Sequence, residues 1–259
     1  MRASLALILL SVVAMTGAAA SENSYLGKWK LNPAKSDFGE TTIAYEETSD
    51  GTIKVTADGQ TYTVKTDGKQ YPTPWGNSVT WKAGADGKSW ERAAYVNGKV
   101  TSTSTAKLAA DGKSLTVEAK PIAADGTVSS DTVVYERVSG SSGLSGKWKT
   151  KNLKIGAPGT MTLAANGADG VLITFVEEKG SCAAKFDGKD HPATGPIWPS
   201  GWTCVVAKQD ASGFDVTWKK DGKAMFSDSF RVAADGRSLT DISKAPASSE
   251  TVKAIYERL

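Results

Sequence analysis

Histidine and cysteine are scarce in this sequence: its 259 residues include one histidine and two cysteines. Common metal sites use several His or Cys ligands, often in C-x-x-C pairs, and the sequence has no such set. The one histidine, His191, precedes Pro192 and is expected to be a loop residue. No serine or threonine stands in an elbow-type nucleophile motif. We therefore expect no metal site, no cofactor and no catalytic residue.

A large excess of one charge is also missing, as is any long apolar run beyond the first residues. The 31 Lys and Arg against 28 Asp and Glu leave a net charge of +3. That balance is too even for a nucleic acid or an anionic membrane surface as partner. No later stretch approaches the roughly 20 apolar residues that a membrane helix needs. We expect no nucleic-acid partner and no transmembrane segment, and the sequence identifies no protein partner.

The first twenty residues have the composition of a secretory signal peptide. A basic residue at Arg2 is followed by an apolar run from Leu5 to Val13 and by small residues that end at Ala20. We predict a signal peptide over residues 1–20, cleavage after Ala20, and a periplasmic or secreted protein. In an oxidising compartment, the isolated pair Cys182 and Cys204 is expected to form a disulfide.

The remaining chain contains one design written twice. The motif L-G-K-W-K at Leu26 returns as L-S-G-K-W-K at Leu144, and Y-E-R ends both copies, at Arg137 and Arg258. A period of this length indicates a duplicated domain, because solenoid repeats run to about 20–50 residues. The Gly- and Ser-rich segment 139–143 is typical of a flexible linker. We predict two domains, over residues 21–138 and 144–259.

Turn signals dominate each copy, and helical periodicity is missing from both. Asp-Gly and Asn-Gly pairs such as Asn97-Gly98 and Asp221-Gly222 separate short segments rich in Thr, Val, Tyr and Trp. The pattern predicts an antiparallel meander of about eight to ten strands per copy. Closing such a meander into an up-and-down β-barrel removes its exposed edges. The fold prediction is all-β, with two tandem barrels after the signal peptide; the alternative is a two-sheet sandwich.

The ends of each copy resemble the signature of lipocalins and the wider calycin group. The first strand carries Gly-x-Trp and the last strand an arginine, and the chain is similar to small bacterial lipocalin-like domains that open with G-x-W-K-L-N-P and close with Y-E-R. The resemblance implies that the tryptophan packs across one end of the barrel and the arginine covers it by a cation–π contact. These residues are therefore architectural: Gly27, Trp29, Arg137, Gly146, Trp148 and Arg258.

Two loops carry aromatic side chains at equivalent places in the copies. Tyr71 and Trp75 lie in a Pro- and Gly-containing connection of the first copy, and residues 191–202 replace it in the second. Loops on a rigid scaffold often carry binding surfaces, and a barrel mouth is a frequent ligand entrance. The alternative is that these rings fold back and plug the barrel end.

The strands around Asn97-Gly98 suggest a ligand site in the first copy. A three-residue loop ending in Gly98 would place on one face Trp90, Arg92, Ala94, Val100, Ser102, Ser104 and Ala106. The equivalent face of the second copy is aromatic, so we expect that copy to be filled and the first to leave space. A buried arginine needs a protein carboxylate or an anionic ligand group as its partner, and our hypothesis is that Arg92 meets the acid group of a ligand. The alternative is that Arg92 lies near a solvated strand end. A further alternative is a two-residue turn at Asn97-Gly98, which would change which residues of the two strands share a face.

These observations favour an exported, non-enzymatic protein that binds a small hydrophobic or amphipathic molecule in a β-barrel. The candidate ligand-binding residues are Tyr71, Trp75, Trp90, Arg92, Ser102 and Ser104. The alternative is an interaction protein with filled barrels that binds an envelope component or another protein through its loops. The third and least favoured possibility is an enzyme. It would require converging titratable groups, which the sequence does not show.

Overall fold

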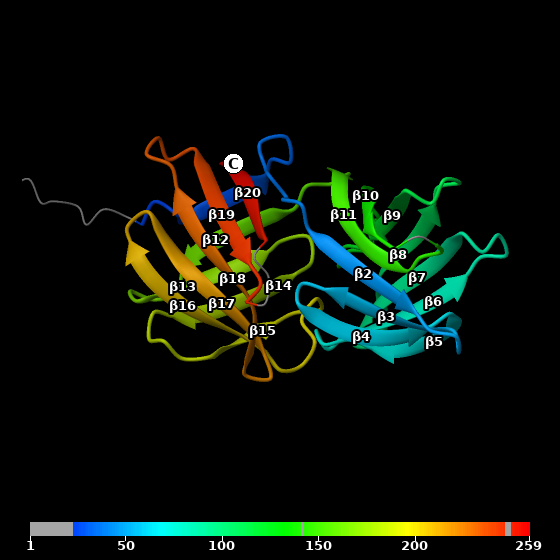
Figure 1. The fold of residues 1–259 in the computed structure, drawn as a ribbon. Helices are drawn as coiled ribbons and strands as arrows, with labels where there is room; N and C mark the ends of the chain where they lie inside the picture. The colour runs from blue at the N-terminus through cyan, green and yellow to red at the C-terminus, as the bar shows by residue number, and fades with distance from the viewer. Residues whose placement is uncertain (1–22, 141, 247–249) are drawn as a thin grey trace, which may run out of the picture.

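The computed structural model describes residues 23–140, 142–246 and 250–259, and these residues form two antiparallel β-barrels of ten strands each (Figure 1). The all-β prediction and the predicted strand number are confirmed. The predicted signal peptide, residues 1–20, lies outside the described residues. In the described part of the chain, no helix has the length and apolar character needed to cross a membrane.

The first barrel is nearly closed. Its strands run in the order β4-β3-β2-β11-β10-β9-β8-β7-β6-β5, so β4 and β5 are its edges, linked through Thr66. The strands are β2 (Thr42–Glu47), β3 (Thr52–Ala57), β4 (Gln60–Lys65), β5 (Asp67–Pro72), β6 (Ser78–Ala83), β7 (Ser89–Val96), β8 (Lys99–Leu108), β9 (Ser114–Pro121), β10 (Asp131–Ser139) and β11 (Gly146–Lys154).

The second barrel is closed, in the order β1-β12-β13-β14-β15-β16-β17-β18-β19-β20. Its strands are β1 (Gly27–Leu31), β12 (Thr160–Ala165), β13 (Gly170–Phe175), β14 (Gly180–Lys185), β15 (His191–Thr194), β16 (Trp202–Asp210), β17 (Gly213–Lys220), β18 (Lys223–Val232), β19 (Ser238–Lys244) and β20 (Thr251–Arg258).

The two copies exchange their first strands. Strand β1, from the first copy, pairs with β12 and β20, whereas β11, from the second copy, pairs with β2 and β10. The physical reason lies in the repeat: β1 and β11 carry the same Gly-Lys-Trp-Lys sequence, so either can complete either barrel. The boundaries predicted at 138 and 144 thus separate the copies in sequence, and each barrel takes one strand across them.

The segment predicted as a flexible linker, 139–143, joins two neighbouring strands of one sheet. Strand β10 ends at Ser139, the first residue of this segment, and pairs antiparallel with β11, which begins at Gly146. Arg137 Nη1 donates a hydrogen bond to Ser145 O over 2.6 Å. A connection this short favours a hairpin. The chain instead passes between the barrels twice, after Leu31 and after Lys154.

Each barrel is closed at one end by the tryptophan–arginine contact that the resemblance implies. The guanidinium of Arg258 lies 4.1 Å from the Trp29 ring centroid, and that of Arg137 lies 4.1 Å from Trp148. Both tryptophans are fully buried, and each indole donates a hydrogen bond to a backbone oxygen four residues earlier, on Tyr25 and Leu144. Because of the strand exchange, each pair joins one residue from each copy.

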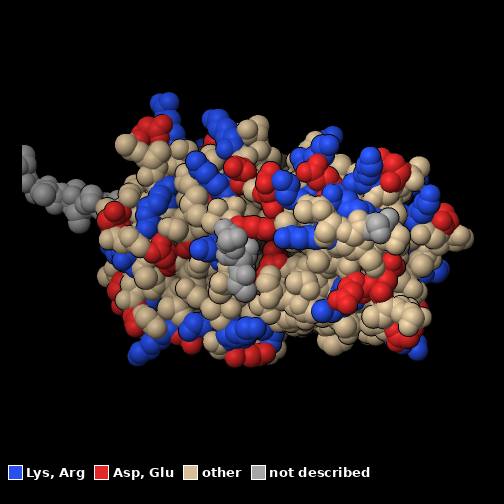
Figure 2. All heavy atoms as spheres, in the orientation of Figure 1, with Lys and Arg blue, Asp and Glu red and all other residues tan. Residues whose placement is uncertain are grey.

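The opposite ends of the barrels face each other. The turn after β5 in the first barrel meets the second barrel, where Trp202 Nε1 donates to Trp75 O over 2.8 Å. The loop after β9 meets the turn after β13, since Ala124 N donates to Glu177 O over 3.0 Å. On the face shown in Figure 2, basic and acidic side chains are interspersed over both barrels. We call the two barrel ends that meet, each opposite its tryptophan–arginine contact, the facing ends of the barrels.

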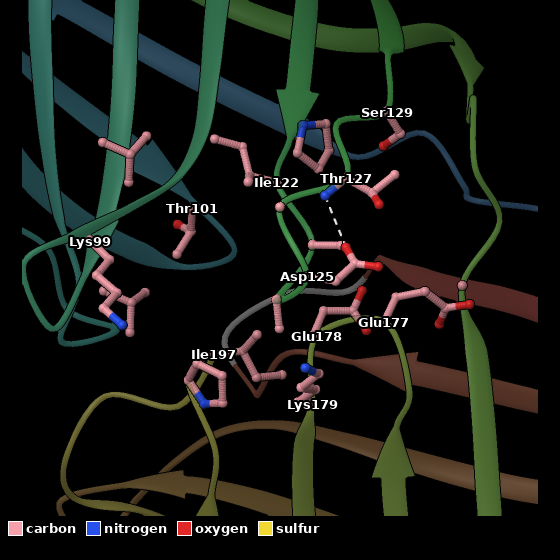
Figure 3. A pocket seen from close by; sticks show the side chains of 18 of the residues that line it. Lys99, Thr101, Ile122, Asp125, Thr127, Ser129, Glu177, Glu178, Lys179 and Ile197 are labelled. Atoms are coloured by element: carbon pink, nitrogen blue, oxygen red, sulfur yellow. Dashed lines mark hydrogen bonds between the residues drawn. The ribbon is translucent and has the colours of Figure 1, made fainter.

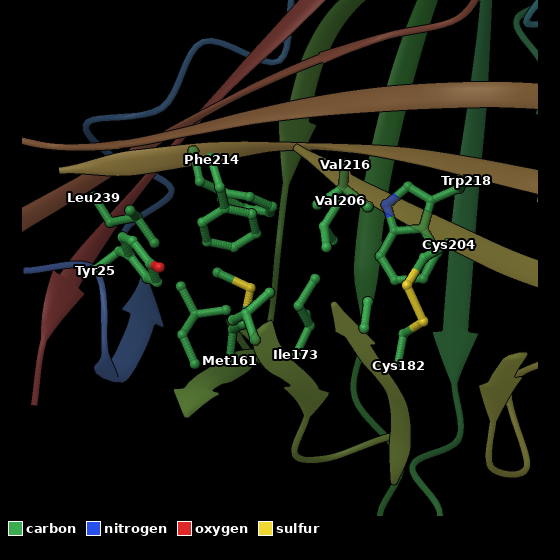
Figure 4. Close-up of a cluster of buried hydrophobic side chains, with 14 of the residues drawn as sticks. Tyr25, Met161, Ile173, Cys182, Cys204, Val206, Phe214, Val216, Trp218 and Leu239 are labelled. Atoms are coloured by element: carbon green, nitrogen blue, oxygen red, sulfur yellow. A yellow bond between two sulfur atoms is a disulfide. The ribbon is translucent and has the colours of Figure 1, made fainter. Parts of the chain in front are cut away.

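Aromatic and aliphatic side chains fill the second barrel (Figure 4). The predicted disulfide Cys182–Cys204 is present and buried in this core, across β14 and β16. Phe214 and Trp218 are fully buried on β17, as the aromatic face of that strand predicted. The alternation of buried and exposed residues along each strand produces this packing.

Candidate functional site

The register predicted for β7 and β8 holds, although the turn that produces it differs. Arg92 pairs with Ser104, and Trp90 pairs with Ala106. Asn97 and Gly98, both with positive φ, form a two-residue turn, so the predicted three-residue loop is wrong. A bulge at Thr101 shifts the pairing back and restores the predicted face beyond it. The same bulge leaves Val100 opposite Tyr95 and exposed, outside the predicted face.

Arg92 lies on the inward face of β7 in the first barrel, beside Ser104 and Trp81. Its Nε donates to Ser104 Oγ over 3.1 Å, and its guanidinium carbon lies 5.0 Å from the Trp81 ring centroid. Arg92 also lowers the pKa of Tyr45, although burial has the larger, opposite effect. Burial raises the pKa of Tyr62 and Tyr135 to about 12, and both lie close enough to feel the charge of Arg92. The tyrosines come from β2, β4 and β10, so several strands of the barrel contribute to this site.

The other candidate ligand residues occupy different places. Trp90 is buried in the core of the first barrel, and Ser102 lies opposite Ala94 on the inward face. The Tyr71 hydroxyl donates to Asp67 Oδ2 over 3.0 Å. A groove of about 430 Å³ includes Arg92 and Ser104 in its lining, but its other residues belong to the outer face of β6–β9.

Trp75 makes contacts across the facing ends of the barrels. Its ring meets Tyr62 edge-on at a centroid distance of 6.0 Å, and it packs against the core of the second barrel. On the other side, Trp198 folds back and stacks on Trp218, with ring centroids 4.8 Å apart. The alternative that these loops plug a barrel end thus holds for the second barrel. The Trp75 loop lies against that plug.

A pair of buried carboxyl groups in the second barrel was missed by sequence reasoning. Asp228 is 8% exposed and accepts a hydrogen bond from Trp218 Nε1 over 2.6 Å. Burial raises the pKa of Asp228 to about 6, and burial together with the charge of Asp228 raises the pKa of Asp241. The available signal was the register, because the face with Phe226 and Phe230 inward also turns Asp228 inward.

A space larger than the groove that includes Arg92 lies between the barrels, at their facing ends, and has a volume of about 740 Å³ (Figure 3). The first barrel contributes the tip of the β7–β8 hairpin and the loop after β9. The second contributes the turn 177–179 and residues 196–197, and the β11–β12 connection completes the wall. The larger apolar side chains of the lining are Val96, Val100, Pro121, Ile122, Pro196 and Ile197. None of the six candidate ligand residues lines this space.

Polar groups stand at a few points on the wall of this inter-barrel cavity. Lys99 and Thr101 lie on one side, and Asp125, Glu178 and Lys179 on the other (Figure 3). Asp125 accepts a hydrogen bond from Thr127 N over 2.9 Å, which lowers its pKa, whereas burial raises the pKa of Glu178. The cavity therefore offers an apolar surface with charged groups of both signs at its edges.

His191, the one histidine, lies at the start of β15 and its Nε2 is 2.9 Å from Asp187 Oδ1. Among the described residues, no group of three or more His, Cys, Asp and Glu side chains is arranged to hold a metal ion.

Comparison with known proteins supplies no relative for this chain: no family model, no curated protein and no solved structure matches it significantly. The fold and the two sites described above therefore rest on the geometry of this chain alone.

Proposed function

We propose that this protein is an exported, non-enzymatic binding protein for a small hydrophobic or amphipathic molecule, held in the inter-barrel cavity. The observation that carries the proposal is the cavity itself. Its volume of about 740 Å³ falls within the roughly 300–1,000 Å³ of typical small-molecule sites. Its mainly apolar wall with a few polar groups is also typical of such sites. The composition of the first twenty residues and the disulfide Cys182–Cys204 support export.

We also propose that each barrel is lipocalin-like, of the calycin type. The support is the Gly-x-Trp strand with its covering arginine, repeated at Trp29 with Arg258 and at Trp148 with Arg137. The ligand position differs from the one expected of a single barrel, because the second barrel is filled with aromatic rings. Both barrels are needed to build the cavity, which gives the duplication a function.

The second candidate function is an interaction protein that binds an envelope component or another protein through its loops. The filled interior of the second barrel favours it, because such a barrel leaves only its surface for binding. The two functions differ in whether the inter-barrel cavity must stay open.

The test compares two tryptophan substitutions on β8. Thr101 lines the cavity, so Thr101→Trp fills it, whereas Thr103→Trp places the same ring at an exposed position two residues along the strand. Native mass spectrometry of protein purified from its own source should show a discrete bound mass on the wild type and on Thr103→Trp. Thr101→Trp should lose the mass that is bound in the inter-barrel cavity. A wild-type protein at its bare mass that also excludes the dye ANS would overturn the carrier function and leave partner capture as the next experiment.

A further inference from the structure

The first barrel contains a cation without an acidic partner. Arg92 is half-buried on the inward face of β7, opposite Ser104 and beside the buried Trp81. None of the ion pairs among the described residues involves Arg92, and its side-chain partners are the hydroxyls of Ser104 and Tyr45 and the ring of Trp81. A guanidinium removed from water gains most from a carboxylate or phosphate, which accepts two of its N–H groups at once.

Hydroxyl donors surround this cation. Tyr62 on β4 and Tyr135 on β10 pack against the core cluster that contains Tyr45 and Trp81, and both lie within the electrostatic reach of Arg92. The carboxylate of Asp58 also lies within reach of Tyr135. Because burial raises the pKa of both tyrosines to about 12, they keep their protons at neutral pH and can donate them in hydrogen bonds. Tyr45 contributes a third hydroxyl, in contact with Arg92. A guanidinium and phenol hydroxyls in one barrel interior are the kinds of donor that bind an oxyanion.

The second barrel shows that the fold does not require a cation at this level. The position of Arg92 is taken there by Val216, which pairs with Asp228 as Arg92 pairs with Ser104. The two copies share their architecture and differ in charge at one level of the interior. The arginine therefore has no role in closing a barrel of this type.

Access to Arg92 is provided by the incomplete closure of the first barrel. Its edges, β4 and β5, are not paired in the sheet, and Tyr62 and Tyr71 stand on these edges, both half-buried. The closed second barrel has no such seam.

We propose that Arg92, with the hydroxyls of Tyr45, Tyr62 and Tyr135, binds the oxyanion of a small organic acid inside the first barrel. The oxyanion is a carboxylate or a phosphate monoester, since both match a guanidinium with flanking hydroxyl donors. This site is separate from the inter-barrel cavity and does not depend on the function proposed for it.

The experiment is calorimetric titration of the full chain with three probes of similar size: hexanoate, hexyl phosphate and the neutral hexanamide. The wild type should bind at least one of the two anions more tightly than hexanamide, and the stronger of the two identifies the oxyanion. Arg92→Leu should weaken that anion roughly tenfold to hundredfold and leave hexanamide unchanged. Arg237→Leu, which removes the same charge from a turn of the second barrel, should bind as the wild type does.

Further variants keep the result decisive. If Arg92→Leu fails to fold, Arg92→Lys and Tyr62→Phe replace it, and each should weaken the anion while the far-UV circular dichroism stays native. Thr101→Trp, which fills the inter-barrel cavity, should bind the anion unchanged, so that failure of one site is distinguishable from failure of the other. The proposal is wrong if both anions bind the wild type no better than hexanamide, or if the folded Arg92 variants retain full affinity.

Discussion

The guanidinium of Arg258 lies 4.1 Å from the ring centroid of Trp29, so the last strand of the chain covers the tryptophan of the first. Arg258 also donates hydrogen bonds to the backbone oxygens of Gly236, Leu26 and Ser24. Arg137 makes the equivalent contacts around Trp148. Each barrel is thus sealed by residues from both copies, and this pairing can be tested directly.

We expect energetic coupling between Trp29 and Arg258 and none between Trp29 and Arg137. In a double-mutant cycle with Trp29→Leu and Arg258→Met, the coupling should be about 1 kcal/mol, because each single variant already removes the cation–π contact. The cycle with Arg137→Met in place of Arg258→Met should be additive. Urea unfolding measures both cycles, and coupling to Arg137 instead would show that the copies keep their own first strands.

Cutting the chain between Gly140 and Gly143 should leave the two halves together. The cut opens only the β10–β11 connection, and β1 and β11 remain paired in the opposite barrels. With a protease site inserted there, the cleaved protein should elute from a sizing column at its original volume and separate only when denatured. Elution as two separate halves without denaturant would contradict the exchange.

Removing the disulfide should destabilise the second barrel. Cys182 and Cys204 are 22 residues apart, and opening a loop of that length costs about 3 kcal/mol in the chain-entropy model. We expect the double substitution to serine to lower the free energy of unfolding by about this amount. Both cysteines are fully buried, so the substitution acts in the core of the barrel. Intact wild-type protein in reductant-free urea is the reference. A change below about 1 kcal/mol would mean that the core alone holds β14 against β16.

The buried carboxyl pair should make stability fall as the pH rises. Burial raises the pKa of Asp228 to about 6, above its ordinary value of 3.8. The contribution of Asp228 to the free energy of unfolding is therefore complete below about pH 4 and is lost as the pH rises through about 6. Each pKa unit between the folded and the unfolded state corresponds to about 1.4 kcal/mol in the free energy of unfolding. Asp228→Asn keeps an acceptor for Trp218 and should reduce the loss of stability between pH 4 and pH 7.

The matched control for that measurement is Asp215→Asn, which removes a carboxylate paired with Arg231 on the same barrel. Urea unfolding at a series of pH values gives the difference between each variant and the wild type. This difference is needed because other carboxylates, such as Asp86, have lowered pKa values and act in the opposite direction. Equal pH profiles for the two variants would show that Asp228 is ionised in the folded protein as it is in the unfolded chain.

The fold class could be predicted from local chemistry. Pairs such as Asn97-Gly98 supply the positive φ that hairpin turns need, and alternation along the strands places Trp90 and Arg92 inward. The strand exchange could not be predicted, because β1 and β11 have the same sequence in their first four residues and fit either sheet equally well. Which barrel each completes depends on the length and path of the connections.

The inter-barrel cavity was beyond sequence reasoning for a different reason. Its walls are turns and loops, such as those around Asn97 and Asp125, whose positions depend on how the two barrels meet. No periodic pattern encodes that arrangement. By contrast, the site around Arg92 follows from strand alternation, and only the bulge at Thr101 had to be learned from the structure.

The exchange of first strands also determines the order in which the protein can fold as it is made. The first barrel is complete once Lys154 has been synthesised, since all of its strands lie between Thr42 and that residue. Strand β1 precedes them all, but its partners β12 and β20 come later, and β20 is the last strand of the chain. Contacts of such high sequence separation form slowly. The Trp29 strand therefore stays unpaired beside a finished barrel until β12 is made, and it gains its second neighbour only when Arg258 arrives.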